Sequence, residues 1–238
     1  MSALLKSFWQ MLRCVKQDGM LFLSCLAPFL CGCFFKFAIP SIERMLTGYY
    51  GLPHILSSYY ALFDLLLATM TPLMFSFVSA MVILEETDEH TAGYLFITPL
   101  RKSGYLLSRL GIPLGFSLAI TIGALEFFKL SDISHHIMFL ISVAGVLQGL
   151  ISALIIISFS TNKLEGLAIT KISSLMILGL FGPFFLTGRT VFLLFPLPSL
   201  WMARILLNGG FGNIFFATLT SLLWVTLLGK SFFCKVSV

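Results

Sequence analysis

Charge is what this sequence has least of. Only 11% of its 238 residues are charged, whereas 58% are hydrophobic. Soluble domains carry about 25% charged residues, so this chain has too few charges to solvate a globular surface. Disorder is excluded as well, because disordered segments combine few apolar residues with many charges. The chain is therefore predicted to be an all-α integral membrane protein, since barrel strands would alternate in polarity.

The sequence also lacks the residue patterns of an enzyme. Its five cysteines contain no C-x-x-C pair, and three lie in one apolar run, which is typical of packing residues. The sequence at 229–231 matches the end of a phosphate-binding loop, but Trp224 stands where the first glycine should be. Ser117 lies within an apolar run, and no histidine occurs in any later run to act as its base. We predict no catalytic residue, no metal site and no cofactor in this chain.

Six apolar runs have the roughly 20 residues that a helix needs to cross a bilayer. They cover about 20–42, 60–84, 106–128, 137–160, 167–186 and 213–228. Lysine and arginine concentrate at both chain ends and in the segments after the second and fourth runs. Because basic residues collect in cytoplasmic loops, both termini are predicted to be cytoplasmic. The net charge of +5 is therefore explained by topology, and we expect no nucleic-acid partner.

The whole chain, 1–238, is predicted to form one transmembrane domain. Two of its segments outside the six apolar runs also have apolar faces. Within 1–18, apolar residues recur at helical spacing, which favours an amphipathic helix in the membrane interface. A cytoplasmic extension of the first span is an equal alternative. The segment 187–212 is long and apolar, and predicts a re-entrant or interfacial outer hairpin anchored by Trp201.

Polar and small residues inside the runs are few. Lys36, Asp64 and Glu126 lie near the outer ends, which favours interface charges or a lysine–carboxylate pair. Small residues recur every four positions from Gly111 and from Gly145, a pattern that permits close helix contact within a bundle or between two copies. Candidate pathway or packing residues are Thr69, Ser76, Gln148, Ser152, Gly111 and Gly115.

The segment 85–105 is the most charged part of the chain. It begins with acids, continues through an apolar stretch at 94–97, and then reaches Thr98-Pro99, where a helix is expected to end. This order predicts a short amphipathic helix that docks into a groove of another protein. A helix that rests on lipid is the alternative, which the acids disfavour because the inner leaflet is anionic.

This segment resembles the loop between the second and third spans of the ABC-2 type permease family, the membrane subunits of ABC transporters. The departures are Tyr94, where the family has threonine, and Arg109, where lysine is common. The sequence at 162–166 is similar to a second family signature, and the six-span profile matches over the whole chain. The matching residues are Glu86 or Glu89, Gly93, Leu95, Thr98, Pro99 and Arg109.

The resemblance implies a division of labour in a bacterial plasma membrane. A separate ATPase subunit would bind ATP and Mg, and two permease chains, identical or homologous, would form the pathway in the lipid. The residues implied to couple to the ATPase are Glu85, Glu86, Glu89, Gly93, Leu95, Thr98 and Pro99. Most of the family are exporters, and the apolar bundle favours a hydrophobic or amphiphilic cargo: a drug, a lipid or an antimicrobial peptide, as in resistance or self-immunity. A stand-alone secondary transporter or channel is the alternative, which the scarcity of carboxylates inside the runs disfavours.

Overall fold

The computed structural model describes residues 3–51, 55–89, 91, 101–186 and 188–236. Within these ranges all regular structure is helical, and six helical segments are long and apolar enough to cross a membrane, which confirms the predicted class. Those segments are Gly19–Tyr50, Ser57–Asp88, Gly104–Phe128, His135–Phe159, Lys163–Phe185 and Phe211–Lys230.

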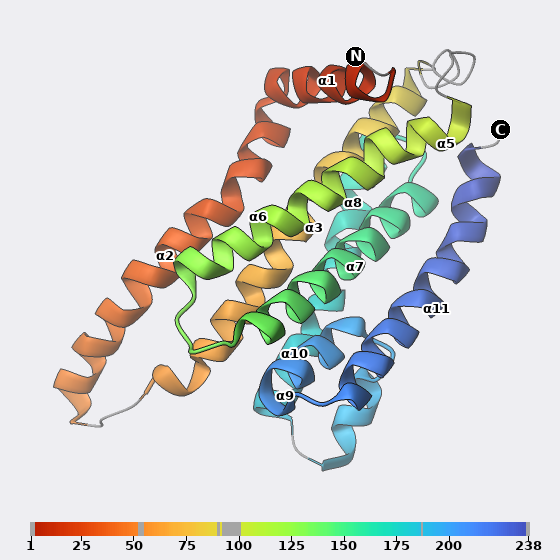
Figure 1. Cartoon of the computed structure of the whole chain (residues 1–238). Helices are drawn as coiled ribbons and strands as arrows, with labels where there is room; N and C mark the ends of the chain where they lie inside the picture. Colours follow the sequence, from red (N-terminus) through yellow and green to blue (C-terminus); the bar gives the residue numbers. More distant parts are fainter. Residues whose placement is uncertain (1–2, 52–54, 90, 92–100, 187, 237–238) are drawn as a thin grey trace.

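The helices form one bundle with both chain ends at the same end (Figure 1). We call this the inner end, which the charge distribution predicts to be cytoplasmic, and the opposite end the outer end. The first half of the bundle consists of α1 (Ala3–Gln17), α2 (Gly19–Tyr50), η1 (Ser57–Tyr59), α3 (Tyr60–Asp88), α5 (Arg101–Leu106), η2 (Leu107–Gly111) and α6 (Ile112–Phe128). The second half consists of α7 (His135–Phe159), α8 (Lys163–Ser174), η3 (Leu175–Phe181), α9 (Gly182–Phe185), η4 (Gly188–Leu194), α10 (Pro198–Asn208) and α11 (Phe211–Val236).

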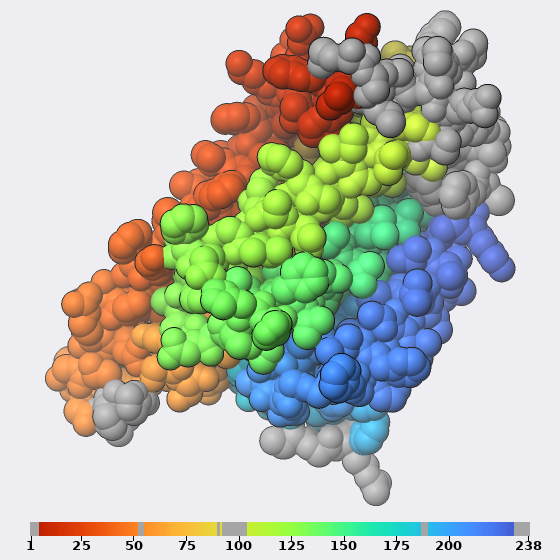
Figure 2. All heavy atoms as spheres, viewed as in Figure 1, coloured from red at the N-terminus to blue at the C-terminus, as the bar shows by residue number. Residues whose placement is uncertain are grey.

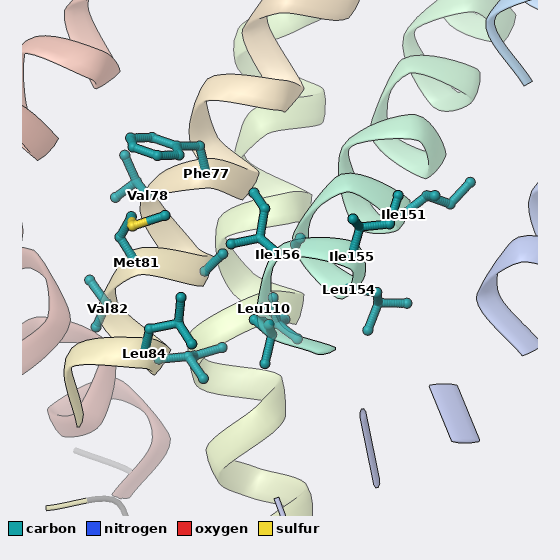
Figure 3. Packing of buried hydrophobic residues seen from close by; sticks show 14 of the residues in the cluster. Phe77, Val78, Met81, Val82, Leu84, Leu110, Ile151, Leu154, Ile155 and Ile156 are labelled. Atoms are coloured by element: carbon teal, nitrogen blue, oxygen red, sulfur yellow. The ribbon is translucent and has the colours of Figure 1, made fainter. Parts of the chain in front are cut away.

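Helices α3 and α7 form the centre of the bundle. The most apolar part of α3 is 78% buried, whereas that of α2 and that of α11 are each only 17% buried, so the latter two are peripheral. Figure 3 shows Val78 and Val82 on one side of α3, while Ile156 reaches α3 from α7 on the other. Figure 2 shows α2, α6 and α11 on the outer surface, where their apolar side chains are suited to contact lipid.

Glycines on α7 allow the close approach of α3. A Cβ atom on Gly145 would lie 2.6 Å from the carbonyl oxygen of Ala68, and one on Gly149 would lie 2.9 Å from that of Pro72. Both distances are shorter than an ordinary van der Waals contact. The small-residue pattern of α7 therefore serves packing within this chain.

Helix α1 is separate from the first span. Asp18 adopts an extended conformation between the two helices, and its carboxylate accepts hydrogen bonds from the amides of Met20 and Leu21 at the start of α2. Of the two alternatives for 1–18, the structure thus excludes a continuous extension of α2. Met11 and Val15 face the bundle and Trp9 is exposed, so α1 has two apolar sides.

Helix α2 is longer than its apolar run at 20–42. Its 32 residues span about 48 Å, against about 30 Å for the hydrocarbon core. Its outer turns are held by Glu43, whose carboxylate accepts hydrogen bonds from the amide of Ser57 and the hydroxyl of Tyr60. Lys36 forms no carboxylate pair among the described residues, since it donates to the carbonyl oxygen of Phe127, whereas Glu126 pairs with Lys129 over 3.6 Å.

The segment 187–212 contains a helix that is buried in the bundle. Residues Pro198–Ala203 of α10 are all buried, and the indole N–H of Trp201 donates to the carbonyl oxygen of Phe195 over 3.0 Å. The Trp201 ring stacks on Phe216 of α11 with ring centroids 4.7 Å apart. Trp201 therefore packs between α10 and α11 and is only 5% exposed.

Candidate functional site at the inner end

A fully buried arginine lies where α1, α3 and the start of the third span meet. The side chain of Arg109, in η2, is 0% exposed and forms an ion pair with Glu86 in the last turn of α3. The Arg109 Nε lies 3.0 Å from each carboxylate oxygen, and Nη2 also donates to Oε1. A third contact runs from Nη1 to the carbonyl oxygen of Ser7 in α1, over 2.6 Å. One guanidinium thus joins three elements.

Three further side chains complete this network. The hydroxyl of Tyr105 donates to Glu86 Oε2 over 2.7 Å, and the hydroxyls of Ser7 and Ser108 lie 3.2 Å apart. Burying two opposite charges costs solvation, which only good geometry and additional hydrogen bonds offset. We define the Arg109 network as Arg109, Glu86, Tyr105, Ser7 and Ser108.

The backbone at Arg109 departs from a regular α-helix. Residues Leu107–Gly111 form a π-helix, and three residues in succession, Ser108, Arg109 and Leu110, are buried there. A π-helical turn is rare and is frequently found at functional sites. Here it coincides with the one arginine that the described part of the chain buries completely.

A second group of charges lies beside the first. The ammonium of Lys163, at the start of α8, contacts Asp18 Oδ2 at 2.7 Å and Glu85 Oε2 at 2.9 Å. The hydrogen bond from Lys163 holds the pKa of Asp18 below its ordinary value. All three side chains are more than a quarter exposed, so each pair contributes less than about 1 kcal/mol to stability. Their effect is to align α8 with the junction of α1 and α2.

An open cavity of about 620 Å³ lies next to the Arg109 network and the charged group around Lys163. Its lining includes Asp18, Glu85, Glu86 and Glu89, together with Cys14 of α1. The inner end therefore combines a rigid buried ion pair with an accessible acidic surface.

Comparison with known proteins identifies the family. A family model described as Rv2686c-like, "Fluoroquinolones export permease protein Rv2686c-like", matches residues 11–233. The chain belongs to this export permease family. No curated protein and no solved structure matches it. The permease is accordingly a multi-pass membrane protein and a transporter, not an enzyme.

The acids predicted to couple the permease to a partner occupy three different environments. Helix α3 continues to Asp88, so Glu85 and Glu86, which begin the predicted coupling segment, lie in its last turns. Glu86 is buried in the Arg109 network, Glu85 is half-buried beside Lys163, and Glu89 is exposed. The remaining predicted coupling residues, Gly93, Leu95, Thr98 and Pro99, lie outside the described residues.

The pairing of Arg109 with Glu86 was not predicted from the sequence. From the sequence, Arg109 is predicted only as the basic residue at the start of the third span. A signal was present, since an arginine inside an apolar run needs a carboxylate partner, and Glu86 is only 23 residues away. Ser7 and Tyr105 carried no comparable signal.

The four polar candidate pathway residues are buried on α3 and α7, the two central helices. They are Thr69, Ser76, Gln148 and Ser152. Thr69 donates to backbone carbonyl oxygens of its own helix, and Ser152 shares a hydrogen bond with Ser173 of α8. Within the described residues, Ser76 Oγ and Gln148 Oε1 have no hydrogen-bond partner.

The two candidate glycines differ from these polar residues. Gly111 faces the side chain of Leu107 in its own helix. Gly115 is exposed, and apart from the neighbouring backbone of its own helix no described atom lies within 4 Å of a Cβ built on it. Packing within one chain therefore uses the small residues of α7 but leaves Gly115 of α6 open.

Proposed function

We propose that this chain is the membrane subunit of an ABC-2 type exporter. A separate ATPase subunit supplies the energy, and the cargo is a hydrophobic or amphiphilic drug of the kind named in the family description. The Arg109 network carries this proposal, because it connects the charged segment 87–104 to the membrane helices.

The network holds both ends of that segment. Glu86 precedes the segment and Tyr105 follows it. The Tyr105 hydroxyl donates to the carboxylate of Glu86, which Arg109 also binds. A force applied to the segment therefore reaches α3, the most buried helix of the bundle, and through Ser7 also α1. This arrangement supports movement of the helices as a body when a partner pulls or pushes at the inner end.

The acidic surface beside the network supports docking of a partner. Glu89 is exposed at the end of α3 and borders the cavity with Asp18 and Glu85. Since Glu86 is neutralised internally, the acids accessible to a partner are Glu89, Asp88 and part of Glu85. A basic rim on the ATPase subunit would complement them.

Transport assays in vesicles test the proposed function. Inside-out vesicles that contain the permease and its ATPase are expected to accumulate a fluorescent fluoroquinolone only with ATP and Mg. Vesicles with an ATPase that lacks its phosphate-binding lysine are the matched control and should accumulate none. Gradient-driven accumulation by the permease alone, without ATP, would overturn the proposal in favour of a secondary transporter or channel.

Replacing the exposed acid tests the docking surface. Glu89→Gln is expected to weaken binding of the ATPase about fivefold, because the loss of one interfacial ion pair costs about 1 kcal/mol. Affinity would be measured by titrating detergent-solubilised permease with the ATPase. Glu126→Gln is the matched control, since Glu126 is an exposed glutamate at the outer end. Equal loss in both variants, or none in Glu89→Gln, would contradict the assignment.

A further inference from the structure

A groove at the outer end has no role in the proposed function. It has a volume of about 460 Å³ and lies between α10 and the first turns of α11. Three aromatic rings, Phe195, Trp201 and Phe216, form much of its lining, and Arg204 of α10 is the charged residue among them. The groove thus combines a flat apolar wall with a positive charge.

Arg204 is held by two of these aromatic rings. Its guanidinium lies 5.0 Å from the centroid of Phe195 and 5.1 Å from that of Trp201, which is cation–π geometry. Stacking on rings uses the faces of the guanidinium and leaves the N–H donors at its edge. In the described part of the chain, no carboxylate pairs with Arg204 and its guanidinium donates no hydrogen bond. The fixed cation is therefore available to an anion from outside the chain.

The course of the groove indicates which anion. From Phe216 the lining continues to Thr220, which lies one helical turn farther along α11 and closer to the inner end of the bundle. The neighbouring face of α11 is apolar and exposed, with Leu219 48%, Leu222 61% and Leu223 55% accessible. A phospholipid has this same order of groups, with a phosphate at the membrane surface and acyl chains that run inward from it.

We propose that this groove binds a phospholipid of the outer leaflet. The lipid phosphate accepts hydrogen bonds from Arg204, and its acyl chains lie against Phe216 and the apolar face of α11. Arginine suits this role because its planar fork contacts two phosphate oxygens at once. The bound lipid would connect α10, which is buried in the bundle, to the peripheral helix α11. This inference goes beyond the proposed export function and does not depend on the ATPase.

Native mass spectrometry of the full-length permease in detergent tests this site. The probes are dioleoylphosphatidylglycerol and dioleoylglycerol, which share acyl chains but differ in the phosphate. Arg204→Gln is expected to weaken binding of the phosphatidylglycerol about tenfold, because hydrogen bonds to charged groups contribute about that factor. Binding of dioleoylglycerol should be weak and should not change.

Arg44→Gln provides the matched control, because Arg44 is an exposed arginine at the outer end of α2 and away from the groove. It should bind phosphatidylglycerol like the wild type. Arg204→Lys, which keeps the charge but not the fork, should lose less than Arg204→Gln. Wild-type binding by Arg204→Gln would overturn the proposal. So would an Arg204-dependent site that takes the flat anion 2-naphthoate and not the phospholipid.

Discussion

Arg109→Gln is expected to lower the stability of the permease by about 3–5 kcal/mol, because it leaves the buried carboxylate of Glu86 without its cation. Among the described residues, the hydroxyl of Tyr105 would still donate to that carboxylate. The change also removes the hydrogen bond to the carbonyl oxygen of Ser7, which weakens the contact between α1 and the third span, although the hydroxyls of Ser7 and Ser108 still meet there. The measurement is the apparent melting temperature of the purified chain in detergent, which should fall by several degrees.

A double variant separates stability from force transmission. Arg109→Met combined with Glu86→Met removes both charges, and an apolar pair of similar volume often stabilises a fold as well as the ion pair did. The double variant should therefore melt closer to the wild type than Arg109→Gln does. Its ATP-driven transport should nevertheless stay about tenfold lower, because neither end of the segment 87–104 is then fixed to a common carboxylate.

An exposed arginine at the same end provides the control. Arg13→Gln, on the exposed side of α1, should change neither melting temperature nor transport. If Arg109→Gln melted and transported like Arg13→Gln, the network would have neither role. Full transport by the double variant would show that the network stabilises the fold but does not transmit force.

The membrane helices could be predicted from sequence because hydrophobic length alone determines them. Six apolar runs became six spanning segments, since a backbone in lipid has to satisfy its own hydrogen bonds. Helix ends followed a different rule. The acids after Leu84 end the apolar run, yet α3 continues to Asp88, because Glu86 forms an ion pair with Arg109 of the next span. Such a partner is visible only in three dimensions.

For aromatic and small residues too, the sequence does not show which part of the chain packs against them. A tryptophan near the end of an apolar segment is typical of an interface anchor, but Trp201 is buried because α10 enters the bundle. The small-residue patterns of α6 and α7 look alike in the sequence. In the structure, α3 packs against the small residues of α7, whereas Gly115 of α6 is left open. Periodicity identifies a face of a helix but does not identify what covers that face.

Gly145→Val is expected to destabilise the bundle by about 3 kcal/mol, near the upper end of the usual cost of overpacking. A Cβ on Gly145 would lie 2.6 Å from the carbonyl oxygen of Ala68 and 3.3 Å from the ring of Pro72. Neither is the free end of a flexible side chain, so α3 and α7 would have to move apart. Because this is the central contact of the bundle, the apparent melting temperature in detergent should fall by several degrees.

Gly115→Val is the matched control, and it also tests the open face of α6. Apart from the neighbouring backbone of its own helix, no described atom lies within 4 Å of a Cβ on Gly115, so this variant should keep the melting temperature of the isolated chain. Equal destabilisation by both variants would contradict the packing assigned to α3 and α7. A loss of transport in Gly115→Val at an unchanged melting temperature would have a different cause. It would indicate that the open face contacts a second permease chain, which is the remaining alternative for this row of small residues.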